Sequence, residues 1–370
     1  MKKSIKVILV AGARPNFMKI APLIKAIREH NKVRGGGPRI DPVLVHTGQH
    51  YDNNMSDVFF KELGIPAPDV NLEVGSGSHA EQTARIMLAF EPLCLRERPD
   101  WVVVVGDVNS TLACSLVAVK VGVKLAHVEA GLRSFDRSMP EEINRLVTDA
   151  LADLLLTPSA DADENLKREG IPAAKIKLVG NIMIDALVSN LEKAERSKLS
   201  YELGIKPRGF AYVTLHRPSN VDKRANLRAL IRELESLSKK MPVVFPVHPR
   251  TRKMISELGG RRKDNTGLFL LEPVGYHDSL WLERHASFVL TDSGGLQEET
   301  TYFKTPCLTL RSNTERPVTI KLGTNKLTSL RTLKADIRTI LDGPRRRGRI
   351  PKYWDGHTAE RIVKALLEAS

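Results

Sequence analysis

Short apolar runs rich in β-branched residues alternate with amphipathic helical segments along the chain. In the first half the predicted strands are Ile5 to Val10, Pro42 to Thr47, Trp101 to Gly106, Lys124 to Glu129, Leu154 to Pro158 and Ile176 to Val179. In the second half they are Phe210 to Leu215, Val243 to Val247, Leu268 to Leu271, Phe288 to Thr291 and Pro306 to Leu310. Strands that alternate with helices are joined by crossovers and form parallel sheets. The pattern predicts an α/β protein.

The alternation loosens near Gly180, where a charged helix from about Asp185 to Leu203 separates the two series. A chain of 370 residues is also long enough for two domains. We therefore predict two doubly wound, Rossmann-like domains, one over residues 1–180 and one over residues 181–355, facing each other across a cleft. The C-terminal helix, about residues 356–370, is expected to pack back on the first domain.

Composition narrows the class of protein. No apolar run approaches the roughly 20 residues of a membrane span, and the short apolar stretch after Met1 is a poor secretion signal, so no membrane partner and a cytoplasmic location are expected. Cys94, Cys114 and Cys307 are far apart in apolar surroundings, as expected of core residues rather than of a disulfide or metal site. The net charge of +14 is spread among acidic residues with few aromatics, which favours an anionic small molecule over nucleic acid.

Nearly every predicted strand ends in a polar or ionisable group. The strand ends in the first half carry Gly12 and Arg14, then Gly48, Gln49 and His50, then Gly106 and Asp107, then His127 and Glu129. Those in the second half carry His216 and Arg217, then His248 and Arg250, then Asp292 to Gly295. Ligands of open parallel sheets bind beyond the carboxyl ends of the strands. The pattern indicates a ligand site at these ends.

Two of these strand ends admit more than one interpretation. In TDSGGLQEE, the stretch Ser293 to Gly295 forms either an anion site at a helix N-terminus or an ordinary helix cap. In the first case Glu299, about one turn into the helix, is placed to bind a ribose diol. In HVEAGLR, His127 and Glu129 lie on one side of a strand. They are catalytic groups, or metal ligands with His216 or Asp107 completing the set, or His127 is a structural residue bonded to a neighbouring carbonyl. Because no HxH or HExxH pattern is present, we predict no metal site.

The ordered set of motifs resembles the non-hydrolysing UDP-N-acetylglucosamine 2-epimerases. The set consists of GARPNFMK, TGQHYD, GDVNST, HVEAGLRS, MPEEINR, GN-x-x-IDAL, the HR of TLHRPSN, PVHPRT, LTDSGGLQEE, TERP and DG-x-x-AERI, and it runs nearly end to end. The resemblance implies a GT-B type fold, an isomerase and a homodimer. It also implies a UDP-sugar partner, bound by Arg14, Lys19, Arg133, Ser293, Gly294, Gly295, Glu299 and Arg316. Asp107, Glu129, Glu142 and His216 would form the catalytic group.

The chain departs from the family at two motifs. Bacterial members that substrate activates at a second site typically have QHRE-x-L and HRREN where this chain has QHYDNN and HRPSN. The resemblance therefore does not extend to that activation. GQHYD, followed by SDVFFKELGIP, is shared with relatives that act on UDP-2,3-diacetamido-2,3-dideoxyglucuronic acid, so both UDP-2-acetamido sugars stay open as substrates.

The expected chemistry suits these residue types. C2 of a nucleotide sugar has no neighbouring carbonyl, so its proton becomes acidic only once the C1–O bond to UDP breaks. Loss of that proton gives a 2-acetamidoglucal, and return of UDP with protonation from the opposite face inverts C2. Such a route needs cations for the leaving pyrophosphate and carboxylates on both faces of the ring. It needs no nicotinamide or other cofactor, and the chain has no GxGxxG motif after its first strand.

Three other activities are alternatives, of which a retaining glycosyltransferase would share the fold. A retaining GT-B glycosyltransferase would need an acceptor site and fewer carboxylates, and a hydrolysing epimerase would release free N-acetylmannosamine and UDP. A sensor would bind the UDP-sugar and leave it unchanged, and three carboxylates beside an anionic ligand argue against it. The sequence therefore favours the epimerase.

Overall fold

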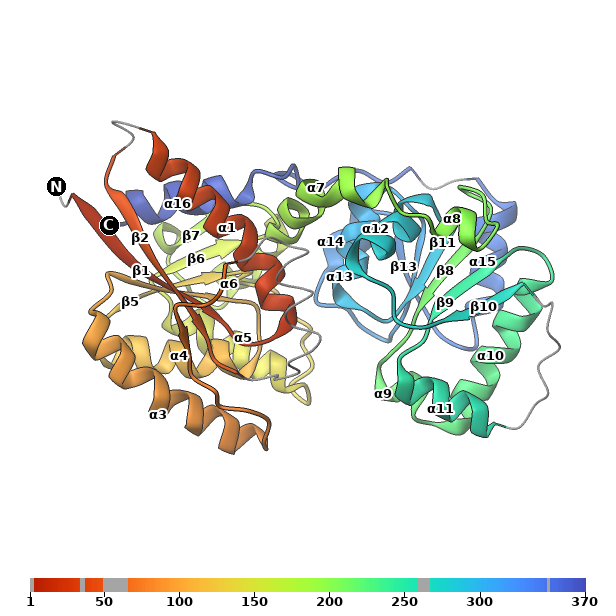
Figure 1. Ribbon diagram of the computed structural model, residues 1–370, viewed down its shortest axis with the longest axis horizontal. Coiled ribbons are helices and arrows are strands. Elements are labelled where there is room, and N and C mark those ends of the chain that lie inside the picture. The colour runs from red at the N-terminus through yellow and green to blue at the C-terminus, as the bar shows by residue number, and fades with distance from the viewer. Residues whose placement is uncertain (1–2, 34–36, 49–65, 259–266, 345–346) are drawn as a thin grey trace. The chain divides into compact units, whose positions relative to one another are not determined.

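The computed structural model describes residues 3–33, 37–48, 66–258, 267–344 and 347–370. The chain divides into two compact units, which are described separately. The first unit contains Met1–Ala186 and Lys352–Ser370, and the second contains Leu187–Pro351 (Figure 1). Each unit is built around one parallel sheet with helices on its faces.

The first unit contains a seven-stranded sheet in the order β3-β2-β1-β4-β5-β6-β7, with all pairs parallel. Its strands are β1 (Ser4–Ala11), β2 (Arg39–His46), β3 (Val70–Asn71), β4 (Trp101–Val105), β5 (Lys124–Val128), β6 (Leu154–Thr157) and β7 (Ile176–Leu178). Its helices are α1 (Arg14–Lys32), α3 (His79–Glu97), α4 (Asn109–Lys120), α5 (Pro140–Leu151), α6 (Ala160–Arg168), the 3₁₀ turn η1 (Ala173–Lys175), α7 (Ile182–Ala194), which continues into the second unit, and α16 (Thr358–Glu368).

Helices cover both faces of this sheet. Helices α1 and α16 pack together on one face, whereas α3, α4 and α5 form a layer on the other (Figure 1). Strand β4, whose sequence is WVVVV, is buried at every position, as a central parallel strand between two helical layers should be. The α/β prediction is confirmed for this unit.

The second unit contains a six-stranded parallel sheet in the order β10-β9-β8-β11-β12-β13. Its strands are β8 (Ala211–Thr214), β9 (Val243–Pro246), β10 (Leu268–Leu271), β11 (Phe288–Thr291), β12 (Cys307–Leu310) and β13 (Asn325–Thr328). Its helices are α8 (Leu199–Glu202), α9 (Pro218–Val221), α10 (Arg224–Ser238), α11 (Pro249–Glu257), α12 (Tyr276–His285), α13 (Gly294–Phe303), α14 (Pro317–Lys321) and α15 (Leu333–Asp342). Two apolar clusters, one on each side of the sheet, complete a second doubly wound domain.

The strand order reverses once in each sheet, between β1 and β4 and between β8 and β11. In doubly wound sheets this switch point leaves a crevice at the carboxyl ends of the two strands, where ligands bind. The switch points therefore direct attention to the residues after β1 and β4 in the first unit, and to those after β8 and β11 in the second.

The predicted strands are present with ends shifted by at most a few residues, but β3 and β13 were not predicted. Strand β3 has only two residues, and β13 reads NKLT, which carries no apolar run. Both lie at sheet edges, where pairing needs little apolar surface. The charged helix predicted near Asp185 to Leu203 is two helices, α7 and α8.

The last segment of the chain returns to the first unit. Asp185 accepts the backbone N–H groups of Thr358 at 3.0 Å and Ala359 at 2.7 Å, so a side chain of α7 caps α16. Trp354 donates its indole N–H to the Pro158 carbonyl at 2.9 Å. A Cβ at Gly180 would lie 2.1 Å from the Tyr353 carbonyl oxygen, so only glycine fits there. Among the described residues, no helix has both the length and the apolar character needed to cross a membrane.

Candidate functional site

The turn between β1 and α1 lies at the switch point of the first sheet. Asn16 accepts the backbone N–H of Ala13 at 2.9 Å and donates to the Val105 carbonyl at 2.8 Å, so one amide ties the turn to the end of β4. Arg14 is the first residue of α1, and its side chain lies outside the described set. This turn brings Lys19, one helical turn further on, next to the end of the central strands.

Lys19 and Glu129 form a buried ion pair, with side chains 10% and 3% exposed. A Cβ at Gly106 would lie 2.9 Å from Lys19 Nζ, so the ammonium group fits because position 106 is glycine in the left-handed region. Glu129 itself has φ of 70°, which is uncommon for a residue with a side chain. The structure thus joins two predicted site residues and holds one in a backbone conformation that often marks functional positions.

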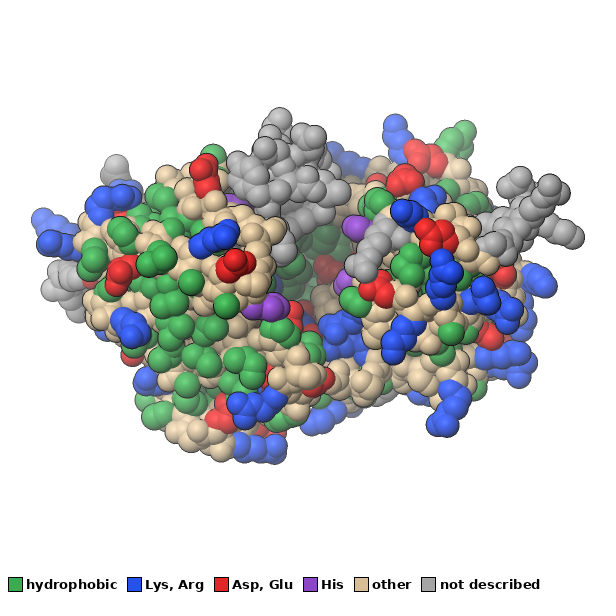
Figure 2. Space-filling view, turned by 90° about the horizontal axis from the view of Figure 1, so that it is seen from below, with side chains coloured by type: hydrophobic (Ala, Val, Ile, Leu, Met, Phe, Trp, Pro, Cys, Tyr) green, Lys and Arg blue, Asp and Glu red, His purple; other side chains and the backbone are tan. Residues whose placement is uncertain are grey.

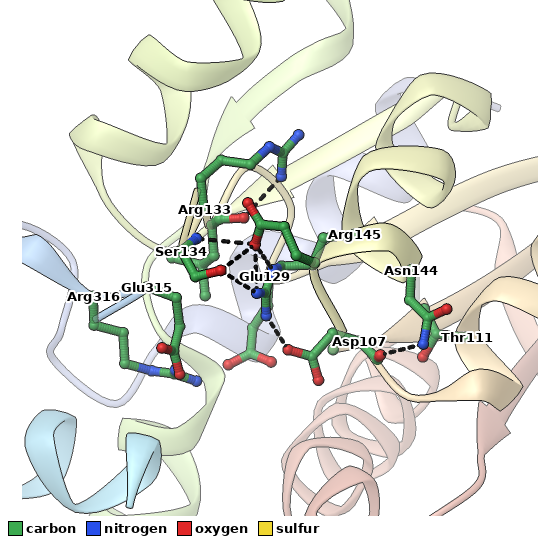
Figure 3. A network of polar contacts seen from close by, with 12 residues as sticks. Asp107, Thr111, Glu129, Arg133, Ser134, Asn144, Arg145, Glu315 and Arg316 are labelled. Atoms are coloured by element: carbon green, nitrogen blue, oxygen red, sulfur yellow. Dashed lines mark hydrogen bonds and ion pairs between the residues drawn. The ribbon is translucent and has the colours of Figure 1, made fainter. Parts of the chain in front are cut away.

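Arg145 connects two other predicted carboxylates. It lies on α5, pairs with Asp107 and donates to Glu142 from Nη2 at 2.6 Å, and Figure 3 shows its guanidinium directed toward Asp107. Asn144 donates to the Asp107 carbonyl at 2.8 Å, so two consecutive α5 residues fix the loop after β4. Arg145 was not among the predicted site residues, although its i, i+3 spacing from Glu142 on a helix gives a signal for the pair.

The Glu142 carboxylate is surrounded by donors. It accepts the Ser134 N–H at 2.9 Å, the Ser134 hydroxyl at 2.8 Å and the Phe135 N–H at 3.0 Å, in addition to Arg145. Burial alone would raise the pKa of Glu142, but the hydrogen bonds from Ser134 and Arg145 outweigh it and hold the pKa below its usual value. Glu142 is therefore ionised, and it organises the loop after Glu129 together with Arg145.

Arg133 and His127 meet at Asp149, which also was not predicted. The Arg133 guanidinium donates to Asp149 at 2.7 Å and to Glu169 at 2.6 and 2.7 Å, and its side chain is 1% exposed. His127 contacts Asp149 at 2.6 Å and the Gly106 carbonyl at 2.8 Å, so both ring nitrogens face acceptors. This arrangement fits the structural interpretation of His127, and it gives Arg133 protein partners on three of its nitrogens.

In the second unit, His216 lies after β8 and pairs with Asp292, which follows β11. The His216 Nδ1 to Asp292 Oδ1 distance is 3.0 Å, and the imidazole is 59% exposed whereas the carboxylate is buried. Asp292 also accepts the backbone N–H of Arg217 at 2.9 Å and the Asn220 amide at 3.0 Å. Burial would raise the pKa of Asp292, but His216 and Asn220 hold it low. Asp292 therefore orients an exposed histidine, a role that sequence reasoning missed.

The N-terminus of α13 lies directly after Asp292 and Ser293. Ser293 precedes the helix and makes no side-chain cap, and a Cβ at Gly295 would meet nothing within 4 Å. A Cβ at Gly294 would lie 2.8 Å from Arg316 Nη1, so this glycine lets the guanidinium approach the helix start. Backbone N–H groups and a cation at a helix N-terminus favour an anion such as a phosphate.

Arg316 is held by acidic side chains. Its Nε lies 2.8 Å from Glu298 and its Nη1 pairs with Glu315, which in turn accepts Arg311 at 2.8 Å. Burial would raise the pKa of Glu315, but Arg316 and Arg311 hold it well below its usual range. Alternating charges thus fix the position of Arg316 next to Gly294.

Glu299 lies on the second turn of α13 and is buried. It accepts the Tyr276 hydroxyl at 3.2 Å and is hydrogen-bonded to the fully buried Glu283 of α12. Burial raises the pKa of Glu299 to about 7, although the hydrogen bonds from Glu283 and Tyr276 work in the opposite direction. Glu283 and Tyr276 were not predicted, because nothing in the spacing of α12 and α13 links them.

The predicted site residues therefore gather in two places. Lys19, Asp107, Glu129 and Glu142 lie at the switch-point end of the first sheet, and His216, Ser293 to Gly295, Glu299 and Arg316 lie at that of the second. The segment of TGQHYD from Gln49 onward lies outside the described residues. Within the described part of the chain, no group of three or more His, Cys, Asp and Glu side chains is arranged to hold a metal ion.

Known proteins resemble the chain over nearly its whole length. The UDP-N-acetylglucosamine 2-epimerase of Methanocaldococcus jannaschii is 41% identical over 368 residues, which cover 98% of each chain. Its crystal structure in complex with UDP-GlcNAc and UDP covers 98% of this chain and 99% of that one, with a TM-score of 0.85. The UDP-2,3-diacetamido-2,3-dideoxy-D-glucuronate 2-epimerase of Pseudomonas aeruginosa is 42% identical over 325 residues, or 87% of this chain and 88% of its own.

The fold is shared more widely than the sequence. A UDP-glucosyltransferase from Polygonum tinctorium matches with a TM-score of 0.59 at only 12% identity, covering all of this chain and 93% of its own, which shows likeness of fold alone. The family described as UDP-N-acetylglucosamine 2-epimerase matches residues 35–367. With two doubly wound domains and relatives of this identity, the chain belongs to the UDP-N-acetylglucosamine 2-epimerase family, whose members are isomerases with a GT-B-like fold.

Proposed function

We propose that the protein inverts C2 of a UDP-2-acetamido sugar, with UDP-N-acetylglucosamine and UDP-N-acetylmannosamine as the interconverting pair. The observation that carries the proposal is the cluster at the switch point of the first sheet. There Asp107 pairs with Arg145, and Glu129 pairs with Lys19. Carboxylates next to cations suit a reaction that moves a proton while a phosphate-bearing group departs. The activities of the relatives support the same assignment.

The proposed reaction proceeds in two halves. The C1–O bond breaks with its electron pair leaving on the β-phosphate oxygen of UDP, and a carboxylate removes the proton from C2, which gives 2-acetamidoglucal. A second acid then delivers a proton to C2 from the opposite face, and the same UDP oxygen adds back to C1. Asp107, Glu129 and His216 are the proposed acid–base groups. No redox cofactor or metal ion takes part in this scheme.

The remaining residues bind the nucleotide or position other groups. Arg14, Lys19, Arg316 and the helix start at Ser293 to Gly295 are proposed to hold the pyrophosphate as its charge rises, and Glu299 to accept the ribose hydroxyls. Glu142 and Arg133 already have several protein partners. We therefore assign them positioning roles, Glu142 through Arg145 and Arg133 through Asp149.

A second substrate is favoured by one of the relatives. The P. aeruginosa protein, named for a diacetamido glucuronate, is 42% identical over 87% of this chain, against 41% over 98% for the M. jannaschii protein named for UDP-N-acetylglucosamine. UDP-2,3-diacetamido-2,3-dideoxyglucuronic acid is therefore the second candidate, with the same chemistry at C2.

The test is proton NMR of the purified protein in deuterated water with each UDP-sugar in turn, with and without a chelator. We expect resonances of the C2 epimer to appear, with deuterium at C2 of both product and recovered substrate. A product that retains its original C2 hydrogen would indicate an oxidation–reduction route. If both UDP-sugars stay unchanged, the epimerase assignment is contradicted. Loss of turnover with the chelator would show that a metal ion is needed.

We also propose that the protein is a cytoplasmic homodimer. The face of the first unit formed by α3 and α4 exposes a group of apolar side chains (Figure 2), including Leu88, Leu95 and Val119, which are 73%, 57% and 38% exposed. Apolar groups that share one face often mark an interface. The three free, buried cysteines suit a reducing compartment.

Replacing both Leu88 and Leu95 by Glu should convert the dimer to a monomer, measured by light scattering coupled to gel filtration. The matched control, with Leu322 and Leu341 replaced by Glu, removes exposed leucines of the second unit instead and should leave the dimer intact. A wild-type protein that is monomeric at all concentrations would contradict the proposal.

A further inference from the structure

Two glutamates in the second unit are buried against each other. Glu283 on α12 is 0% exposed and Glu299 on α13 is 4% exposed, and their carboxyl groups are hydrogen-bonded. Such a bond needs a hydrogen, because two ionised carboxylates offer only acceptors and repel each other. One of the two glutamates therefore carries a proton.

The neighbouring hydroxyls indicate which glutamate carries it. The Ser279 hydroxyl donates to Glu283 Oε1 at 2.9 Å, so the Tyr212 hydroxyl, 2.8 Å from Ser279 Oγ, must donate to Ser279. Glu283 Oε2 meets no N–H or O–H donor among the described residues. Glu299 receives the Tyr276 hydroxyl at 3.2 Å. A proton on Glu283 gives Glu299 two donors, Tyr276 and Glu283, and leaves Glu283 Oε1 to accept the Ser279 hydroxyl.

We propose that Glu283 is a positioning residue whose protonated carboxyl donates to Glu299 and thereby keeps Glu299 ionised and oriented for the ribose hydroxyls of the nucleotide. This inference rests on the proposed function, in which Glu299 contacts ribose. A carboxylate that is held by two donors on its protein side turns its remaining lone pairs toward a diol in a fixed direction.

The groups around the pair determine how it titrates. They are Tyr212 of β8, Tyr276 and Asp278 of α12, Glu298 of α13 and Cys307 of β12. None of these is basic, and the nearby Arg316 guanidinium is paired with Glu298 at 2.8 Å. Burial raises the pKa of Glu299 to about 7, and burial together with the charge of Glu299 raises that of Glu283 well above its usual range. Glu299 thus takes up a second proton of the pair as the pH falls below 7. Ribose recognition should strengthen as the pH rises through that value.

The test compares UDP with 2′-deoxy-UDP by isothermal titration calorimetry between pH 5.5 and pH 8.5. Titration of the phosphate affects both ligands, so it cancels in the ratio of their dissociation constants. We expect UDP to bind about threefold more tightly at pH 5.5 and about tenfold or more at pH 8.5, the difference between a neutral and a charged hydrogen bond. If UDP binds but the ratio of the two dissociation constants does not change with pH, the inference about Glu283 is overturned and the proposed function is not. Absence of UDP binding at every pH would overturn the proposed function.

Two variants isolate the proton. Glu283→Gln keeps a donor toward Glu299 and an acceptor for Ser279, so the midpoint of the ratio should stay near that of the wild type. Glu283→Met removes the donor, so the midpoint should move to higher pH and the ratio at pH 7.5 should fall about threefold. Equal shifts in both variants, or equal losses of affinity for UDP and 2′-deoxy-UDP, would overturn the inference. The wild-type titration decides the question if the Met variant does not fold.

Discussion

Each unit contains a cluster of acidic groups, but the two units stabilise these clusters differently. In the first unit, Asp107 and Glu142 share Arg145, and Glu129 pairs with Lys19. In the second unit, Glu283 and Glu299 have hydroxyl groups and each other as partners. Hydrogen bonds from Ser134 and Arg145 hold the pKa of Glu142 below its usual value, whereas burial raises the pKa of Glu283 and Glu299 and lets that pair respond to pH. One fold thus supports a carboxylate whose pKa is lowered and a carboxyl pair whose pKa values are raised.

Removing the shared cation should have the largest effect. Arg145→Met leaves Glu142 buried without its cation, so we expect the first unit to lose about 3–5 kcal/mol of its free energy of unfolding. Urea-dependent hydrogen exchange in α5 measures this loss. Arg168→Met, which breaks the exposed pair with Glu164, should cost less than about 1 kcal/mol. Equal losses in the two variants would mean that the Arg145 network is not stabilising.

Removing one carboxylate charge at a time separates chemistry from stability. Asp107→Asn and Glu129→Gln should each lower turnover by about a hundredfold or more, the scale of general acid–base catalysis. The NMR epimerisation assay measures turnover, and circular dichroism confirms that each variant is folded. Glu164→Gln, an exposed carboxylate on α6, is the matched control and should keep wild-type turnover. Near-normal rates in both site variants would remove these residues from the catalytic group.

The pH dependence of stability should have opposite signs in the two units. The pKa of Glu142 is lowered, so its contribution is present above its unfolded pKa of about 4.3 and is lost as the pH falls below it. The pKa of Glu299 is raised to about 7, so its contribution is present below its unfolded pKa and is lost as the pH rises through 7.

Hydrogen exchange, corrected for the intrinsic rate, tests both signs. Between pH 5 and pH 8, α12 and α13 should lose about 2 kcal/mol of protection through Glu299, and more because Glu283 keeps its proton in the folded state, while α5 stays constant. Below pH 4, α5 should lose protection first. Parallel changes in both units would show that the acidic pair does not set the stability of the second unit.

The sequence predicted the sheets better than the side-chain networks. Apolar runs such as WVVVV identify central strands because burial on both faces leaves a clear pattern, whereas NKLT at a sheet edge leaves none. The strand ends correctly marked where polar groups gather. Their partners, such as Asp149 for His127 and Glu283 for Glu299, come from helices whose packing no local pattern specifies. Arg145 differs from these partners, because its position three residues after Glu142 on the same helix is a local pattern that indicates the pair.

The return of the chain to the first unit sets an order for folding during synthesis. The second unit is one continuous segment, Leu187–Pro351, so all its strands have been made before Lys352 is added. The first unit receives Trp354, which donates to Pro158, and α16, which Asp185 caps, only when residues 352–370 emerge. A nascent chain therefore completes its second unit while its first unit still lacks a helix. Pulse proteolysis of ribosome-bound chains halted with residue 351 outside the exit tunnel should find the second unit protected and the first unit open to cleavage.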